Sequence, residues 1–353
     1  MSNGENTGTS RGEFLKRTAG VTGLVVGAGV WTRGARAASQ ADPAPAPDAI
    51  TAAIGTRSFG SGNFALELDG ASIGYLKSVG GGNAVAEVIT EQTQGLFYNR
   101  KHIGTPKYED ITVQVGLSMG KSFYDWIANF WEGIPQRKTG AIIAADFDYN
   151  VRSRREFVDA LISEVMIPAL DGSSKDAAYM TVKIAPESAL TKQGSGKLTV
   201  PVAKQKLWLT SNFKLEIDGL DATRVNKIES FTVKQGFVTD QIGGEREPTK
   251  EPGKVEFPNL KITLAQAGSQ SWYDWFDDFV IQGNNGQEDE RDGTLTFLAP
   301  DLKDELGRVR FFNLGIFKLS TETMEAGAVT RVVAELYCER MELGVGPPAL
   351  PDG

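Results

Sequence analysis

The feature that most constrains the fold is a repeat, because separate blocks of the sequence return after a constant shift of 149 positions. Asn63–Gly70 (NFALELDG) returns as Asn212–Gly219 (NFKLEIDG), and Ser122–Trp126 (SFYDW) returns as Ser271–Trp275 (SWYDW). Single residues keep the same shift: Gly104/Gly253, Tyr108/Phe257 and Phe130/Phe279. One shift shared by several blocks indicates a tandem duplication of a domain of roughly 130 residues, an ordinary size for an independent core.

The repeat also sets the domain boundaries that we expect. A length of 353 residues suits about two domains. The expected segments are a leader (1–38), a Pro/Ala-rich spacer (39–60), a first domain (61–187), a linker (188–210), a second domain (211–345) and a tail (346–353). The linker contains Gly194-Ser195-Gly196, which is typical of a flexible connection.

Each copy opens with the period-2 pattern of a strand, and the apolar residues keep the same phase: Phe64/Phe213, Leu66/Leu215 and Leu68/Ile217. Both runs end in Asp-Gly, which signals a turn. We then expect paired strands in a long hairpin, within Val85–Phe97 and Val225–Val238. A loop around Gly104 or Gly253 leads to a further alternating strand, at 111–115 or 260–264.

An amphipathic helix is predicted after that strand in each copy. Its apolar residues fall at i, i+3, i+4, i+7 and i+8, which makes one wide stripe. They are Phe123, Trp126, Ile127, Phe130 and Trp131 in the first copy, and Trp272, Trp275, Phe276, Phe279 and Val280 in the second. Neither stripe contains a polar ligand, so we interpret both as core packing rather than as cofactor sites.

Further strands are predicted after the helix, at 141–149, 156–167 and 179–185 in the first copy and at 294–298, 309–319 and 329–338 in the second. The fold class is therefore mainly β with one helix per unit. A closed or sandwich-like sheet is expected, because it removes exposed strand edges.

The amino terminus has the anatomy of an export signal. A basic start around Phe14-Leu15-Lys16 precedes a short apolar, Gly-rich stretch and the small-residue pattern Ala35-Arg36-Ala37. The start resembles a twin-arginine signal, except that Gly12 stands where the second arginine belongs. The apolar stretch is too short to span a bilayer comfortably. Export is the expectation, with a vestigial leader or a misplaced start codon as the alternative.

Charge and composition exclude several function classes. The net charge is -8, and the chain beyond its first 40 residues is more acidic still. Such a surface argues against general nucleic-acid binding, which requires a basic footprint. The single cysteine, Cys338, excludes an intrachain disulfide, and its apolar surroundings in the sequence predict a buried structural thiol. Zinc bound by His and Cys is excluded by number.

No catalytic, cofactor-binding or metal-binding residue is predicted. His102, the only histidine, lies in a basic stretch, and the repeat places Glu251 at its position, so we expect a solvated or interface role. The repeated acids are interpreted as turn, cap or salt-bridge residues rather than as a catalytic pair: Glu67/Glu216, Asp69/Asp218 and Asp125/Asp274. The acidic segment 287–292, absent from the first copy, is expected to be a solvated loop, with cation or partner binding as the alternative.

The order of motifs resembles the tail-tube proteins of contractile phage tails and related injection systems. An apolar strand closing in Asp-Gly, a long hairpin, an alternating strand and a helix bearing Tyr-Asp-Trp follow one another in both copies, at about 64–187 and 213–341. The resemblance implies a β-sandwich or barrel flanked by a helix, with six units forming a ring and rings stacking into a tube. Two fused units then imply a trimer with pseudo-sixfold symmetry.

Three functions are weighed on these grounds. The first is a structural protein that self-associates into rings or a tube, with other tail or injection-system components as further partners. The second is an exported monomeric binding module on the same fold, and the third is an exported hydrolase that uses a carboxylate pair. A functional leader would place the protein at the cell surface or outside the cell, and otherwise assembly would be cytoplasmic or in a virion tail.

Overall fold

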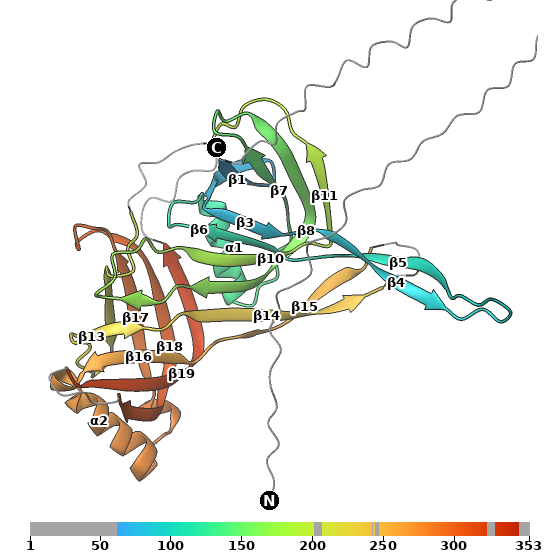
Figure 1. Cartoon of the computed structure of the whole chain (residues 1–353). Helices are drawn as coiled ribbons and strands as arrows, with labels where there is room; N and C mark the ends of the chain where they lie inside the picture. Colours follow the sequence, from blue (N-terminus) through green and yellow to red (C-terminus); the bar gives the residue numbers. More distant parts are fainter. Residues whose placement is uncertain (1–61, 201–206, 242, 244–246, 323–328, 346–353) are drawn as a thin grey trace, which may run out of the picture. The chain divides into compact units, whose positions relative to one another are not determined.

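Two large sheets, which share a run of six strands in the same order, and a two-stranded sheet make up the described fold (Figure 1). The computed structural model describes residues 62–200, 207–241, 243, 247–322 and 329–345. The expected leader, spacer and tail fall outside these residues, as does part of the linker. The described residues all belong to one unit, Ser58–Gly353.

The first sheet runs in the order β2-β1-β7-β8-β10-β6-β3. The bounds are β1 (Asn63–Leu68), β2 (Ala71–Leu76), β3 (Ser78–Gly81), β6 (Ile111–Val115), β7 (Lys138–Ala145), β8 (Val151–Ile167) and β10 (Met180–Ala185). Strand β8 is long enough to have different neighbours at its two ends, since its amino-terminal part pairs with β7 and β11 (Ser188–Gln193) and its carboxy-terminal part pairs with β10.

The second sheet runs β12-β17-β18-β19-β16-β13-β9. Its strands are β12 (Phe213–Ile217), β13 (Val225–Ile228), β16 (Leu260–Ala265), β17 (Arg291–Leu298), β18 (Glu305–Thr321) and β19 (Arg331–Val345), with the two-residue β9 (Leu170–Asp171) at one edge. Six strands therefore follow one another in the same order in both sheets. The single strand β19 occupies the places of both β10 and β11, because it pairs along most of β18.

The correspondence extends to register and irregularities. Val113 pairs with Val79 and Val182, and Ile262, 149 positions later, pairs with Ile228 and Ala334. Opposite the start of β7, the bulge in β8 has Asp159 at a φ of 47°, and opposite the start of β17, the bulge in β18 has Asn313 at 56°. Left-handed backbone at a non-glycine residue is uncommon, so its recurrence at the matching place supports the correspondence between the two sheets.

One cross-strand ion pair occurs in both sheets with its signs exchanged. Glu164 on β8 lies 2.8 Å from Lys183 on β10. At the matching positions, Lys318 on β18 lies 2.7 Å from Glu335 on β19. Opposite charges facing each other across neighbouring strands stabilise the pairing modestly.

Each half also has a long hairpin. β4 (Ala84–Glu91) pairs with β5 (Arg100–Tyr108), and β14 (Phe231–Asp240) pairs with β15 (Thr249–Glu256). The pairs Val85↔Lys107 and Glu91↔Arg100 become Lys234↔Glu256 and Asp240↔Thr249, and the bulge between Ala86 and Val88 returns between Gln235 and Phe237. The two hairpins are the same local structure.

The helices pack their apolar stripes into the core but differ in form. Helix α1 (Lys121–Trp131) buries all five stripe residues. Helix α2 (Gln270–Phe276) continues as a π-helical segment, Asp277–Gln282, and buries Trp272, Trp275 and Phe279 but not Val280. The left-handed glycine that follows lies seven residues after Trp126 (Gly133) and eight after Trp275 (Gly283), so the π-helix accommodates one extra residue.

The structure corrects several sequence-based expectations. Gly104 lies in β5 and Gly253 lies in β15, where loops were expected. These two strands are the second strands of the hairpins. The expected linker begins too early, because residues 188–193 form β11 on the edge of β8. The strands β2 and β3 were not expected, since the Gly-rich stretch 70–82 hides their alternation. The acidic segment 287–292 is not wholly a loop, since β17 begins at Arg291.

Candidate assembly surface

The hairpin of the second half is docked on the sheet of the first half. Strand β14 pairs with the end of β8, with Phe231 opposite Ile167 and Val233 opposite Val165. All four side chains are buried, and Phe231 packs edge-on to Phe311 with ring centroids 6.0 Å apart. A buried extension of one sheet by a strand from the other half makes a directional junction, because backbone hydrogen bonds fix the register.

A charged cluster holds the second hairpin strand at the same junction. The Glu187 carboxylate accepts the backbone N–H of Lys250 at 2.9 Å. Arg137 donates to the Lys250 carbonyl at 2.7 Å and lies 3.1 Å from the Glu251 carboxylate. Burial lowers the pKa of Lys250, and the nearby Asp110 and Glu187 carboxylates oppose that shift. Hydrogen bonds and an ion pair between partly buried charged side chains therefore join the two halves at this point.

Helix α1 adds a third contact between the halves, because it packs against β19. Its stripe residue Trp131 is only 2% exposed, whereas Val280, at the matching place after α2, is 38% exposed. Tyr124 and Tyr273 differ in the same way, since the first is buried and the second is exposed. The same helix face is thus covered in the first half and open in the second.

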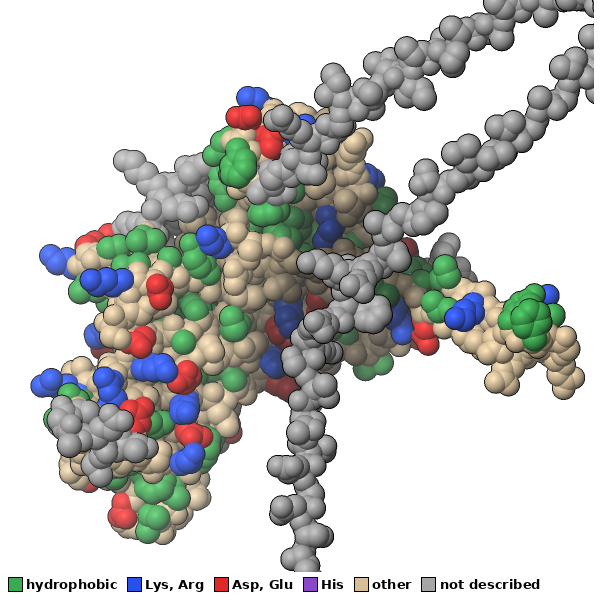
Figure 2. Space-filling model, viewed as in Figure 1, with side chains coloured by type: hydrophobic (Ala, Val, Ile, Leu, Met, Phe, Trp, Pro, Cys, Tyr) green, Lys and Arg blue, Asp and Glu red, His purple; other side chains and the backbone are tan. Residues whose placement is uncertain are grey.

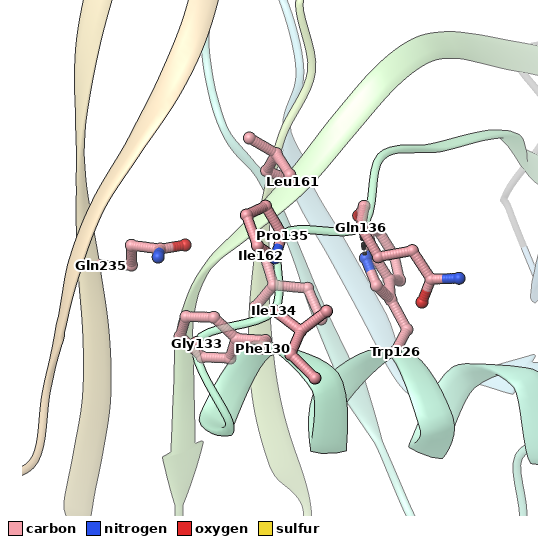
Figure 3. A pocket seen from close by; sticks show the side chains of 9 residues that line it. All are labelled: Trp126, Phe130, Gly133, Ile134, Pro135, Gln136, Leu161, Ile162 and Gln235. Carbon is pink, nitrogen blue, oxygen red and sulfur yellow. Dashed lines mark hydrogen bonds between the residues drawn. The ribbon is translucent and has the colours of Figure 1, made fainter.

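The space between α1, β8 and β14 is small. Figure 3 shows its lining, which includes Trp126 and Phe130 from α1, Ile134 and Gln136 from the turn after it, and Gln235 from β14. Its volume of about 10 Å³ is room for about one water molecule. The site is therefore a packed junction and not a ligand pocket.

The hairpin of the first half has an exposed apolar surface. Val88, Ile103 and Phe97 are 60%, 70% and 100% exposed. Figure 2 shows apolar side chains gathered towards the end of the arm that this hairpin forms. In the described part of the chain, β4 and β5 pair only with each other. Strands with exposed apolar side chains and an unpaired edge are typical of interaction surfaces.

The titratable residues singled out from the sequence lie apart from one another. His102 is an exposed residue of β5, with its Nδ1 4.0 Å from a Glu91 carboxylate oxygen. Cys338 is buried, and burial raises the pKa of its thiol to about 11. Within the described residues, no group of three or more His, Cys, Asp or Glu side chains is placed to hold a metal ion.

Five of the six repeated acids have a side-chain partner for the carboxylate, and Asp218 has a partner for its backbone carbonyl. Glu67 pairs with Arg154 at 2.5 Å and Glu216 with Lys214 at 2.6 Å. Asp69 pairs with Lys138 at 2.6 Å, and the Asp218 carbonyl accepts from Arg291 at 2.6 Å. Asp125 pairs with Lys121 at 2.5 Å, and Asp274 accepts from Gln270 at 2.8 Å. The last two contacts span one helical turn at matching places.

The acidic segment of the second half has a structural contact. Glu290 accepts the Tyr337 hydroxyl at 2.6 Å and the Asn313 amide at 2.8 Å. Burial raises the pKa of Tyr337, and the hydrogen bond to Glu290 raises it further. The segment therefore fixes β17 against β18 and β19 through Glu290.

A sequence comparison relates the first half of the chain to a known family. Residues 60–189 match the family of the T4-like virus tail tube protein gp19. The first half is tail-tube-like. The resemblance expected from the sequence is confirmed for this half, and the mainly β fold with a flanking helix is confirmed as well. No curated protein sequence matched the chain.

The chain is also similar over part of its length to several solved structures. One is the sheath-tube complex of an extracellular contractile injection system (PVC), with 18% identity, a TM-score of 0.35 and coverage of 39% of this chain and 93% of the other. The tube-terminating cap of the anti-feeding prophage has 16% identity and a TM-score of 0.32, covering 41% and 96%. Hcp1 from Flavobacterium johnsoniae has 15% identity and a TM-score of 0.24, covering 38% and 95%. None of the helices in the described ranges is long and apolar enough to cross a membrane.

Proposed function

We propose that the chain is a structural subunit with two copies of one tail-tube-like domain, and that three chains close into a ring with pseudo-sixfold symmetry. The observation that carries the proposal is the junction between the halves. It joins two domains with the same strand order head to tail, since the hairpin of one extends the sheet of the other. A head-to-tail contact leaves one donor and one acceptor surface at the ends of any open row, and a closed ring satisfies both.

The role is structural rather than catalytic, and the partners are further copies of this chain and other components of a tail or injection system. The tail-tube-like sequence of 60–189 supports the self-association. So does the exposed apolar hairpin β4–β5, which an isolated chain leaves in water.

Light scattering and negative-stain electron microscopy of the purified full-length chain test this proposal. We expect rings with a central hole and a particle mass three times the chain mass of 38.1 kDa. A monomer at the highest soluble concentration would overturn it and favour the exported monomeric binding module instead.

We also infer that the leader directs export, so that the protein acts at the cell surface or outside the cell. The basic start and small-residue pattern support this, and Gly12 is the departure from a twin-arginine signal. Deletion of residues 1–38 should retain the protein in the cytoplasm, and the mass of the exported chain should show cleavage. Export of the deleted form would contradict the inference.

A further inference from the structure

The second sheet has a strand edge that matches the occupied edge of the first. On β8, the side that faces β7 is taken up by β14 beyond the last β7 pair. On β18, pairing with β17 ends at Leu314, and no described strand pairs with that side of Ile316–Thr321. The other side of both segments is paired in the same register, with bulges at Ser163 and Phe317. The edge of β18 is thus a second acceptor of the same form.

The hairpin β4–β5 is the matching donor, because its register and bulge repeat those of β14–β15. We propose that β4 of one chain pairs with the β18 edge of a second copy of this chain, antiparallel and with Ala84 opposite Leu319. This assignment rests on the proposed ring. The register is taken from the internal pair Val233↔Val165, because Ala84 has the place of Val233 and Leu319 has the place of Val165. The neighbouring pairs are then Asn83↔Ser320 and Val85↔Lys318.

Charged residues at the two surfaces support the same register. Lys101 on β5 has the place of Lys250, and Glu339 on β19 has the place of Glu187, which accepts the Lys250 backbone N–H. Both Lys101 and Glu339 are exposed in the single chain. The junction therefore brings Lys101 of one copy to Glu339 of the next.

A second ion pair of the internal junction has a counterpart between chains, in which the acidic and the basic side chain change places. Arg137 lies 3.1 Å from Glu251 in the internal junction. The matching positions are Glu290 and His102, so that the carboxylate comes from the sheet and the basic side chain from the hairpin. This places the only histidine of the chain at the interface between copies.

Helix α2 supplies the apolar part of the acceptor. Tyr273 of α2 and Val280 of the π-helical segment after it are exposed. They match Tyr124 and Trp131, which are buried in the first half, where α1 packs against β19. In the ring, the first sheet of the next chain covers α2 as β19 covers α1. The exposed face of α2 and the free edge of β18 thus belong to one acceptor surface.

The junction between chains differs from the internal one in strength. Gly82 and Ala84 stand where β14 has the buried Phe231 and Val233. Less apolar area is buried per contact, so chain-to-chain association is weaker than the internal junction. Ring formation should consequently depend on concentration while each chain stays folded.

Disulfide trapping tests the register directly. Ala84→Cys with Leu319→Cys, in a Cys338→Ala background, should give covalent species of two and three chains under mild oxidation that disappear on reduction. The matched control pairs Ala84→Cys with Ser320→Cys, whose Cβ points to the opposite face of the sheet. We expect at least a tenfold lower yield from the control.

Charge reversal tests the same junction without new cysteines. Lys101→Glu and Glu339→Lys should each lower the fraction of trimer at a given concentration, and the double variant should restore it. Lys303→Glu, the same change at an exposed loop position, should leave the fraction unchanged. Thermal unfolding of each variant shows that the monomer remains folded.

The outcomes separate this inference from the ring itself. Trimers that form without trapping in this register, and that ignore both charge reversals, would overturn the β4–β18 junction but leave the ring intact. A parent protein that stays monomeric would overturn both. Trapping by the first cysteine pair, together with rescue by the double charge reversal, would establish the junction.

Discussion

The two hairpins of this chain share a register and a bulge, yet β14–β15 is docked on a sheet while β4–β5 projects without a partner strand in the described part of the chain. The difference does not lie in the local structure of the hairpins. It lies in whether an acceptor edge is available, since β8 of the first half pairs with β14, whereas among the described residues no other strand pairs with β4 or β5. An acceptor edge within reach, rather than the register of the hairpin itself, therefore decides which hairpin is docked.

The largest effect should come from the helix tryptophans, which compare the two halves of one continuous core. Trp126→Ala should lower the free energy of unfolding by about 3–5 kcal/mol, because it leaves a cavity and removes the hydrogen bond from Nε1 to the Gln136 carbonyl at 2.7 Å. Trp275→Ala should cost less, since the indole N–H of Trp275 has no acceptor among the described residues. Urea unfolding measures both, and a larger loss for Trp275→Ala would contradict the comparison.

The internal junction should be broken by Phe231→Ala. We expect a loss of about 3–4 kcal/mol, because Phe231 is buried between the halves and packs on Phe311. Limited proteolysis should then cut the segment between β11 and β12 faster than in the parent. Gly82, at the matching place just before β4, is the control position. Gly82→Ala should change cleavage of that segment little, although the φ of +72° and a new Cβ only 2.7 Å from Ile111 Cγ1 strain the first half locally. Equal cleavage of parent and Phe231→Ala would indicate that the halves do not depend on this contact.

Glu187 and Glu339 sharpen the comparison between a filled and an open acceptor. Glu187→Gln should destabilise the monomer by about 1–2 kcal/mol, because the carboxylate accepts from Lys250 and lies 3.4 Å from Arg137. Glu339→Gln should leave monomer stability within about 0.5 kcal/mol of the parent, since Glu339 is exposed. Denaturation below the association concentration measures the difference, and equal losses would contradict it.

A smaller, pH-dependent effect should distinguish the loop after β7 from the matching loop after β17. Desolvation tends to raise the pKa of Asp146, but hydrogen bonds from Asn150, Arg152 and the Asp148 backbone lower it to about 2, below the usual 3.8. The stabilisation is present above about pH 4 and is lost as the pH falls through 2. Asp146→Asn should remove this part of the acid dependence. The matching residue is Ala299, so Ala299→Ser should leave the acid dependence unchanged, which acid titration by circular dichroism would check.

Much of the fold was predictable because local pattern and final environment agree. The alternation at 64–68 and 111–115 and the stripe on α1 each report one buried face, and the structure buries these faces. The strands β2 and β3 escaped prediction because Gly74 and Gly80–Gly82 interrupt their alternation. The second strand of each hairpin was read as a loop because it contains a glycine and is largely exposed.

The assembly surface was less predictable for a different reason. The sequences of β4 and β14 predict hairpins but do not say what the hairpins contact, since backbone hydrogen bonds carry most of the pairing and leave no side-chain signature. Phe231 and Val233, against Gly82 and Ala84, were the available signal that one hairpin is buried at its base and the other is not.

The exchanged ion pair has a consequence for how the chain avoids misfolding. Two halves with the same strand order can exchange strands while folding, and such errors are a characteristic hazard of repeated structures. If β8 paired with β19, Glu164 would face Glu335, and if β18 paired with β10, Lys318 would face Lys183. Both mixed pairings place like charges opposite each other and are disfavoured. Glu164→Lys with Lys183→Glu keeps an ion pair in each domain but makes the mixed pairings attractive, so the yield of correctly refolded chain should fall. An unchanged refolding yield would show that the exchanged charges do not guard the order of the strands.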